Sequence, residues 1–505
     1  MKQLITDFKS SFRENYSVIK IAATYTLLIY AYFIFSWTLS IDTELATYDL
    51  GNSQYLYHLD VQFLRLGRPI LGLLTYLTGS VPLPYFNSIL ALSLIFCSYL
   101  IWITILNKIY SSKNLITIFG LFYLISPIYI FQLNFVNQSI IVGLGFLLSA
   151  LSIYFVSLYF SKEKNLLSFI LSTFLLFLSV GIYQSFLIYF LGGAAIILIL
   201  NCLKLNLKFK DVLAYSFYLL SIILISLFFY FITTNIVYLF VGKSHYLLNF
   251  FDGWSKDHSI IKSVQILIKY IFDIIKSPIT FIYALCYMTL LLLIFRIKKL
   301  YSLIIFLGLV TPLLLPIIFL SPMPLRILFS IPLSIAMIAI LCYKVFNKKR
   351  LILVLAIVVA LFNFKQICLL TYSKNMAEKY NEKILNTLYQ KAYQMIGKDI
   401  YHTPIVFVSS GKISNSFFIK ETKKQPFYFN SNFDLFSSIF PGPSWQESNL
   451  NHRAYFFSHW LNNYYKMPSR KQIEFGEKIA KDMPIYPDEG SILIKDNILI
   501  IKLSN

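Results

Sequence analysis

An acidic stretch between two apolar runs holds the first residues that could do chemistry. It reads "IDTELATYDLGNSQYLYHLDVQFLRLGRPI" over residues 41–70 and carries four carboxylates, at Asp42, Glu44, Asp49 and Asp60. A carboxylate can act as a general base, taking the proton of a hydroxyl group as that hydroxyl attacks an electrophilic carbon. The alternative is a solvated surface loop in which acids and arginines only pair with one another. Spacing alone leaves both interpretations open.

Three arginines could serve the same reaction. Arg65 and Arg68 follow the acids, and Arg326 begins a later apolar run in "SPMPLRILFSIPL". A planar guanidinium group suits phosphate oxygens, so these side chains could stabilise a departing phosphate. Arg326 could instead extend its charge to lipid headgroups at a membrane surface.

A polar pair and three histidines complete the candidates. Tyr183 and Gln184 interrupt the apolar "SVGIYQSFLIYFLGGAA" and would face a cavity or a helix bundle, where they bind substrate or hydrogen-bond another helix. His245, His258 and His452 lack the spacing of metal ligands. No cofactor is therefore expected, and a need for a divalent cation stays open.

The composition of the chain indicates what positions these residues. Of 505 residues, 57% are hydrophobic and 13% are charged, and the mean hydropathy is +0.68. The apolar residues fall in runs long enough to cross about 30 Å of hydrocarbon. The sequence therefore predicts an all-α polytopic membrane protein.

The runs predict about eleven spans. These lie near residues 18–40, 84–107, 114–133, 138–160, 166–181, 183–203, 211–241, 278–295, 300–320, 325–346 and 350–371. The fifth and sixth are short and separated only by "GIYQS", so they could form one broken or re-entrant element.

The distribution of basic residues predicts the orientation. With a cytoplasmic N-terminus, the cytoplasmic loops carry "KEK", "KLNLKFK", "RIKK" and "NKKR", whereas "QLNFVNQ", "GIYQS" and "SPMPLR" on the other side hold one basic residue. This is the pattern that positive charge imposes on membrane proteins. The formal net charge of +21 is therefore expected to orient helices and to meet anionic lipid, and nucleic acid is not an expected partner.

Three regions are predicted on the external side. Residues 41–83 form the first loop, and residues 242–277 form a second loop with a helix lying in the membrane interface. Residues 372–505 follow the membrane part, residues 1–371, as a small α/β domain. That domain should contain an amphipathic helix, a strand at "TPIVFVSS" and a closing hairpin in "GSILIKDNILIIKLSN".

Four segments in order along the chain resemble one family. They are "LGRPILGLLTYLTG", "SVGIYQSFLIYFLGGAA", "SPMPLRILFSIPLSIA" and "MPIYPDEGSILIKDNILIIKLS". In sequence and spacing they look like the serotype-converting O-antigen glucosyltransferases of bacteria and their phages. The resemblance implies a membrane-embedded glycosyltransferase of the GT-C type. Such an enzyme takes glucose from undecaprenyl-phosphate glucose and adds it to O-antigen repeat units of lipopolysaccharide, on the periplasmic face of the inner membrane. A donor synthase and a flippase would be its partners.

The resemblance also implies an essential acid in the first external loop. Members of the family often carry an adjacent acidic pair there, whereas this chain has "IDTE" followed by "YD" and "LD". We expect Glu44, then Asp42, to be the general base, because both lie next to the end of the first helix, near the headgroup plane. Asp49 and Asp60 are expected to position substrate.

The expected reaction is a single displacement with inversion at the sugar carbon. Gly67 and Arg68 match the Gly-Arg element that follows the acids in the family. Arg68 and Arg326 would offset the charge growing on the lipid phosphate, aromatic helix faces would hold the polyprenyl chain, and the C-terminal domain would bind the polysaccharide.

Two alternatives remain at this point. One is a lipid-linked sugar flippase or another transporter, with Gln184 and the broken helix lining its path. The hydropathy pattern shows no internal repeat, and a transporter has little use for a large external domain, which favours the transferase. The other alternative is an O-antigen polymerase or a transferase of another sugar.

Overall fold

The computed structural model describes most of the chain. It covers residues 2–36, 59–79, 83–160, 165–244, 261, 264–265, 268–269, 272, 278–296, 311, 325–346, 348–408 and 468–503. The chain divides into two compact units. The helical unit comprises Met1–Phe35, Tyr57–Leu133 and Gln138–Cys368, and the largest segment of the C-terminal unit is Leu369–Asn505. The predicted span near 300–320 and most of the predicted interfacial helix lie outside the described residues.

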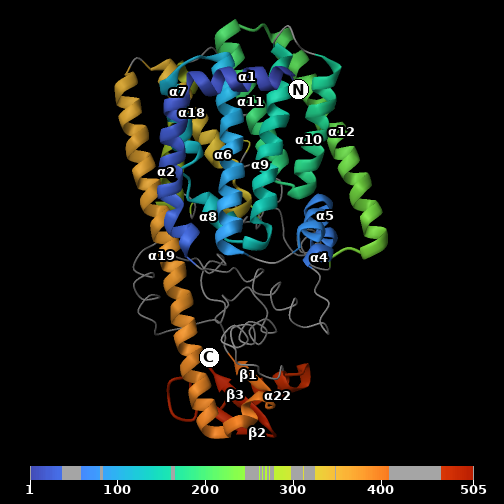
Figure 1. Cartoon of the computed structure of the whole chain (residues 1–505), viewed down its shortest axis with the longest axis vertical. Helices are drawn as coiled ribbons and strands as arrows, with labels where there is room; N and C mark the ends of the chain where they lie inside the picture. The colour runs from blue at the N-terminus through green and yellow to red at the C-terminus, as the bar shows by residue number, and fades with distance from the viewer. Residues whose placement is uncertain are drawn as a thin grey trace. The chain divides into compact units, whose positions relative to one another are not determined.

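Helices dominate the described residues (Figure 1). In chain order they are α1 (Lys2–Glu14), α2 (Tyr16–Phe35), α4 (Leu59–Arg65), α5 (Pro69–Thr78), α6 (Pro84–Ile109), α7 (Lys113–Tyr123), α8 (Ile128–Leu133), α9 (Val136–Ser157), η1 (Leu158–Phe160), α10 (Leu166–Ile182), α11 (Phe186–Leu205), α12 (Phe209–Val241), α15 (Pro278–Arg296), η3 (Leu325–Ile327), α18 (Ile331–Val345), α19 (Lys349–Ile396), η4 (Gly397–Tyr401) and α22 (Arg470–Ala480).

Six helices within the described residues are long and apolar enough to cross a membrane. They are Tyr16–Phe35, Tyr85–Ile109, Val136–Phe160, Phe186–Leu205, Phe209–Val241 and Lys349–Tyr372. Each matches one of the predicted spans. Helices α10 and α18 are also apolar but shorter. The helical, membrane-compatible architecture is thereby confirmed, whereas the predicted number of eleven spans is not.

One predicted span is divided in two. Residues 114–133 form α7 and the short α8, separated by the segment 124–127. Pro127 has no backbone N–H and restricts the residue before it to extended conformations, so a continuous helix ends here. Hydropathy alone could not reveal the interruption, because the residues on both sides are apolar.

The carbonyl groups freed by this break bind side chains from distant helices. The hydroxyl of Tyr30 lies 3.0 Å from the carbonyl oxygen of Leu124 and 3.1 Å from that of Ser126. The amide nitrogen of Asn363 donates to the carbonyl of Ile125 at 2.9 Å. Buried carbonyls without partners would be costly in an apolar bundle, so these two side chains stabilise the interruption.

The interior of the bundle holds a hydrogen-bonded aromatic cluster. The indole nitrogen of Trp102 donates to the Tyr189 hydroxyl at 2.9 Å, and the hydroxyls of Tyr189 and Tyr123 are 2.7 Å apart. The Ser98 hydroxyl lies 2.7 Å from that of Tyr123. All four side chains are buried, so mutual pairing removes the cost of placing their polar atoms among apolar side chains.

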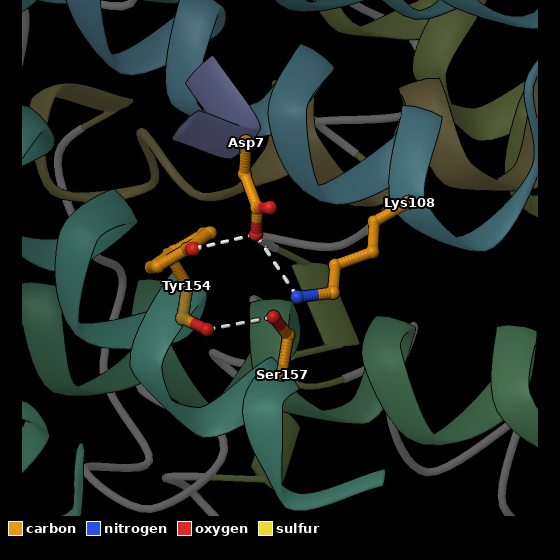
Figure 2. A network of polar contacts seen from close by, with 4 residues as sticks. All are labelled: Asp7, Lys108, Tyr154 and Ser157. Atoms are coloured by element: carbon orange, nitrogen blue, oxygen red, sulfur yellow. Dashed lines mark hydrogen bonds and ion pairs between the residues drawn. The ribbon is translucent and has the colours of Figure 1, made fainter. Parts of the chain in front are cut away.

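The N-terminal helix lies across one end of the helical unit (Figure 1). Figure 2 shows what holds it there: one carboxylate oxygen of Asp7 lies 2.9 Å from the Lys108 ammonium and 2.8 Å from the Tyr154 hydroxyl. Ser157 donates to the carbonyl of Tyr154 at 2.6 Å. The sequence analysis predicted a cytoplasmic N-terminus but no docked helix there.

A second carboxylate fixes the end of α1. The side-chain nitrogen of Asn107 donates to Glu14 at 2.8 Å, and the Ser10 hydroxyl donates to Glu14 at 2.8 Å. These bonds hold the pKa of the Glu14 carboxyl below its usual value. The hydrogen bonds to the ionised Glu14 carboxylate stabilise the docked helix at neutral pH. This stabilisation is lost as the pH falls through the lowered pKa and the carboxylate takes up a proton.

The C-terminal unit contains a small mixed sheet. Its strands are β1 (Ile405–Val408), β2 (Ile492–Lys495) and β3 (Ile498–Lys502), in the spatial order β1-β3-β2. β1 is parallel to β3, whereas β2 and β3 form an antiparallel hairpin. The two residues between them, Asp496 and Asn497, have φ values of 51° and 58°, as a two-residue hairpin turn requires. The predicted strand and hairpin are thereby confirmed.

Helix α22 packs against this sheet. Ser469 and Gln472 form a capping box at its start. At its other end the buried ammonium of Lys502 donates to the carbonyl of Met483 at 2.8 Å. The helix approaches β1 closely, because a Cβ atom at Gly476 would lie 2.6 Å from Val406 Cγ1 and 3.0 Å from Val406 Cβ.

This close approach gives the first prediction. Replacing a helical glycine by alanine normally stabilises a protein by about 0.5–1 kcal/mol. We expect Gly476→Ala to lower stability instead, because overpacking of this kind costs about 1–3 kcal/mol. The free energy of unfolding of the full chain would be measured in detergent, with the exposed Lys478→Ala on the same helix as control. Equal or higher stability of Gly476→Ala would show that α22 moves away from β1 at little cost.

Candidate functional site

The site begins at the turn between α4 and α5. Gly67 has φ +70°, its backbone N–H donates to the carbonyl of Leu64 at 3.0 Å, and the N–H of Arg68 donates to that of Phe63 at 3.0 Å. This pair of bonds is the Schellman arrangement that ends a helix on a left-handed glycine. Pro69 then begins α5, where its missing N–H costs nothing. The sequence "LGRP" therefore turns the chain sharply and exposes one carbonyl, that of Gly67.

The Gly67 carbonyl joins three parts of the bundle. It accepts a hydrogen bond from the Gln184 side-chain nitrogen at 2.8 Å and another from the Tyr230 hydroxyl at 2.8 Å. Gln184 also lies 3.0 Å from the Tyr230 hydroxyl. Gln184 belongs to the break between α10 and α11, and Tyr230 belongs to α12. Two consecutive predicted spans are therefore separate helices, and the polar residues between them hold the α4–α5 turn.

Arg68 lies against an aromatic ring beside this turn. Its guanidinium carbon is 4.1 Å from the centroid of Tyr183, a distance at which a cation is attracted to the ring face. Tyr183 is 5% exposed. The Arg68 Nε is buried, and no hydrogen-bond partner for it exists among the residues that the structure describes. A planar cation is thus held by its face, and the described part of the chain leaves one of its donors unused.

Arg65 has a different environment. Its Nε donates to the carbonyl of Val241 at 2.7 Å, and its own carbonyl accepts from the N–H of Ser244 at 3.1 Å. Val241 is the last residue of α12, so the guanidinium group binds a carbonyl at the negative end of a helix. Arg65 therefore connects α4 to α12 and leaves its charge at the edge of the site.

Asp60 lies in the first turn of α4 and is half-buried. Helices α4 and α5 approach closely there, because a Cβ atom at Gly72 would lie 2.8 Å from the Asp60 carbonyl oxygen. On its other side α5 packs on α10, where a Cβ atom at Gly181 would lie 2.5 Å from Ile70 Cγ1. The backbone of Asp60 is thus held against α5, and α5 is in turn packed on α10.

Arg326 lies on η3, just before α18, and η3 packs against α8. Phe329 follows it, with its ring 5.9 Å from that of Tyr183 and 4.7 Å from that of Phe186. The Arg68 guanidinium group packs on the same Tyr183 ring. The segment that contains Arg326 and Phe329 therefore lies next to the contact between Arg68 and Tyr183. Asp42, Glu44 and Asp49 lie outside the described residues.

The sequence analysis missed two tyrosines of this site. Tyr230 binds the Gly67 carbonyl, and a Cβ atom at Gly67 would lie 2.8 Å from the Tyr238 hydroxyl. Tyr230, Thr234 and Tyr238 recur every four residues along α12 and so share one helix face. A stripe of hydroxyl groups within an otherwise apolar span was the signal that could have revealed them.

The described residues offer no ready place for a metal. Among them, no group of three or more His, Cys, Asp or Glu side chains could hold an ion. The chemistry of the described site is that of cations and hydroxyl groups near a helix turn, at the end of the helical unit opposite α1 (Figure 1). Such a set can bind and stabilise an anion.

Comparison with known proteins decides the family. A family model described as glucosyl transferase GtrII matches residues 31–389. The chain therefore belongs to the GtrII glucosyl transferase family. The match runs from α2 into α19 and contains the acidic stretch, the Gly67–Arg68 turn, Gln184 and Arg326. No curated protein and no solved structure matches the chain. The resemblance inferred from the sequence is confirmed at the level of this GtrII family.

The Gly67 turn of this GtrII protein gives the second prediction. Alanine at a left-handed position costs about 1–2 kcal/mol. We expect Gly67→Ala to cost about 1–3 kcal/mol more than that, because its Cβ would also press on the Tyr238 hydroxyl. The matched control is Gly397→Ala, since Gly397 has φ +63° and nothing within 4 Å of an added Cβ.

The measurement is thermal unfolding of the detergent-solubilised chain. Adding Tyr238→Phe to Gly67→Ala should recover part of the loss, because the phenylalanine ring lacks the crowding oxygen. If Gly67→Ala and Gly397→Ala destabilise the protein equally, the close approach of Tyr238 to the turn is wrong.

Proposed function

We propose that this GtrII family member transfers glucose from undecaprenyl-phosphate glucose to O-antigen repeat units of lipopolysaccharide, at the periplasmic face of the bacterial inner membrane. Family membership supports the glucosyl transfer. The observation that carries the choice of donor is Arg68, a planar cation held on the Tyr183 ring with a buried, unused donor nitrogen in the described part of the chain. A lipid phosphate is the anion that a cation at this end of an apolar bundle would meet.

The physical case for Arg68 rests on preorganisation. A buried donor without a partner loses hydration and gains nothing in return. The cost is offset when the donor binds charge that develops during reaction, because no reorientation is then needed. As the bond between glucose and the lipid phosphate breaks, negative charge grows on the phosphate oxygens, and a guanidinium group can bind two of them. Arg326, on the adjoining segment, is the second cation that we assign to this phosphate.

The distribution of lysines supports the proposed orientation. At the α1 end, Lys108 pairs with Asp7 and the Lys344 ammonium lies 3.6 Å from the centroid of Tyr110. Lys349 begins α19 near them, 5.8 Å from the Tyr343 ring. Positive residues favour the cytoplasmic side of a membrane. We therefore assign this end to the cytoplasm and the Arg68 end to the periplasm, with residues 372–505 as a periplasmic domain that binds the polysaccharide acceptor.

The proposed reaction is a single displacement. Glu44, or Asp42, takes the proton of an acceptor hydroxyl as its oxygen attacks the anomeric carbon of glucose. The bond from that carbon to the phosphate oxygen breaks, the lipid phosphate leaves with the bonding electron pair, and the configuration at carbon inverts. Asp49 and Asp60 position the sugar, and apolar aromatic helix faces hold the polyprenyl chain.

The general base gives the third prediction. We expect Glu44→Gln, or Asp42→Asn if Asp42 is the base, to lower the rate of glucosyl transfer by about 100-fold or more. The controls Glu489→Gln and Asp488→Asn remove exposed carboxylates of the C-terminal unit and should leave the rate unchanged. The readout is sugar composition and linkage of lipopolysaccharide from a host that makes and flips the donor lipid. Glucosylation that survives both first-loop substitutions, at normal membrane abundance, would contradict the assignment of the base.

Arg68 gives the fourth prediction. Arg68→Lys keeps the charge but loses the stacked plane and paired donors, so we expect kcat to fall about tenfold. Arg68→Met removes the charge as well, and a loss of about 100-fold is expected. Arg470→Met is the control, because Arg470 is exposed on α22 and pairs with Glu474 at 3.2 Å. A rise in the donor KM at constant kcat would mean that Arg68 only binds the donor and does not stabilise the leaving phosphate.

A further inference from the structure

Two buried amide side chains flank the turn between α8 and α9. Gln132 is 1% exposed and Gln138 is 4% exposed. Within the described residues, neither the nitrogen nor the oxygen of the Gln132 amide has a hydrogen-bond partner, and the Gln138 amide oxygen has none. The mechanism proposed above uses neither residue.

A row of packed rings runs from α8, the helix that carries Gln132, to the Arg68 site. Tyr129 lies one turn before Gln132 on α8, so the two share a helix face. The Tyr129 ring is 5.4 Å from that of Phe146, which is 5.0 Å from that of Phe329. Phe329 packs on Tyr183, the ring that holds Arg68.

A second contact places α8 beside the other cation. Helix α8 packs against η3, and η3 carries Arg326. In Figure 1, α8 lies at the same end of the helical unit as α4 and α5, away from α1. Gln132 on α8, and Gln138 near the start of α9, therefore lie at the end of the bundle where the lipid phosphate is proposed to bind.

Buried amides that lack partners among the described residues, close to the proposed phosphate site, are suited to binding a polar ligand. A glutamine amide offers two donors and an acceptor, and leaving them unpaired costs stability. Hydrogen bonds from these amides to a polar ligand would be stronger in the protein interior than in water. Each hydroxyl of a pyranose ring donates one hydrogen bond and accepts others. One hydroxyl can therefore accept from the amide nitrogen while its neighbour donates to the amide oxygen.

We propose that Gln132, assisted by Gln138, binds hydroxyl groups of a pyranose, either the glucosyl group of the donor or a sugar of the acceptor. This inference rests on the proposed sugar transfer. Because Gln132 is almost fully buried, the saccharide reaches it only when a neighbouring segment moves, as closure of an active site over its substrate requires. The amides are binding and orienting groups, and they exchange no proton with the reacting atoms.

The experiment uses the full chain in lipid nanodiscs. Gln132→Met and Gln138→Met keep the length of the side chain and remove its hydrogen-bonding groups. The control is Asn201→Leu, since Asn201 is a buried amide whose nitrogen donates to Ile197 of its own helix at 2.8 Å. For each protein, KM is measured separately for polyprenyl-phosphate glucose and for the acceptor polysaccharide, and the unfolding temperature is measured with no saccharide and with each one.

We expect Gln132→Met to raise one KM about tenfold, the effect of losing roughly one neutral hydrogen bond in a water-excluded site. Which KM rises identifies the source of the pyranose. We also expect the unfolding temperature without saccharide to rise, because an unpaired buried amide has been removed, and the stabilisation by that saccharide to shrink. Asn201→Leu should leave both KM values unchanged.

Other outcomes overturn the inference and can be told apart. If the parent protein transfers glucose but neither KM changes in Gln132→Met or Gln138→Met, the amides do not bind sugar. If the unfolding temperature of Gln132→Met falls and both KM values stay constant, an ordered water satisfies the amide in the resting protein. If the parent protein transfers no glucose, the proposed function fails, and the inference then stands only if a saccharide stabilises the parent more than Gln132→Met.

Discussion

The carbonyl oxygen of Gly67 is the atom on which the candidate site depends. It accepts hydrogen bonds from Gln184 and Tyr230, side chains that are far from it in sequence and belong to other helices. The left-handed conformation of Gly67 both ends α4 and turns this carbonyl outward. Because Arg68 is the next residue and Tyr183 precedes Gln184, the same contact brings the cation onto the ring. One backbone group thus sets the relative position of three helices and of the groups proposed to act on phosphate.

The apolar interior explains why so many polar side chains bind backbone groups. Buried carbonyls among apolar side chains need hydrogen-bond partners, so Tyr30 and Asn363 bind those at the α7–α8 break, as Gln184 binds that of Gly67. Interruptions of helices are therefore the places where tertiary contacts gather. Gln132 lies close after one interruption, and Arg68 lies within another. The proposed chemistry is concentrated at these points because the backbone groups freed at an interruption bind polar side chains inside the bundle.

Local patterns made part of this structure predictable. The two residues Asp496 and Asn497 tolerate positive φ and sit between β-branched runs, which is enough to predict a hairpin. Long apolar runs gave most helices within a few residues. The docked helix α1 was missed because its polar face binds protein through Asp7, which no periodicity indicates. Gln184 could be selected as a polar residue in an apolar stretch, but its partner Gly67 lies 117 residues away, and only the folded chain brings them together.

Helix α1 links the depth of the protein in the proposed membrane to the positions of α6 and α9. Asp7 binds it to Lys108 of α6 and Tyr154 of α9, Phe8 and Phe12 stack on each other along it, and the ring of Tyr16, at the start of α2, lies 5.9 Å from that of Phe12. Tyrosine is enriched at the boundary between hydrocarbon and headgroups, so the exposed Tyr16 would hold the end of α1 at that depth in the proposed membrane. A bilayer thinner or thicker than the bundle would then strain the ion pair as well as the lipid. The acyl-chain length of the surrounding lipids thereby becomes a variable to which α6 and α9 respond directly.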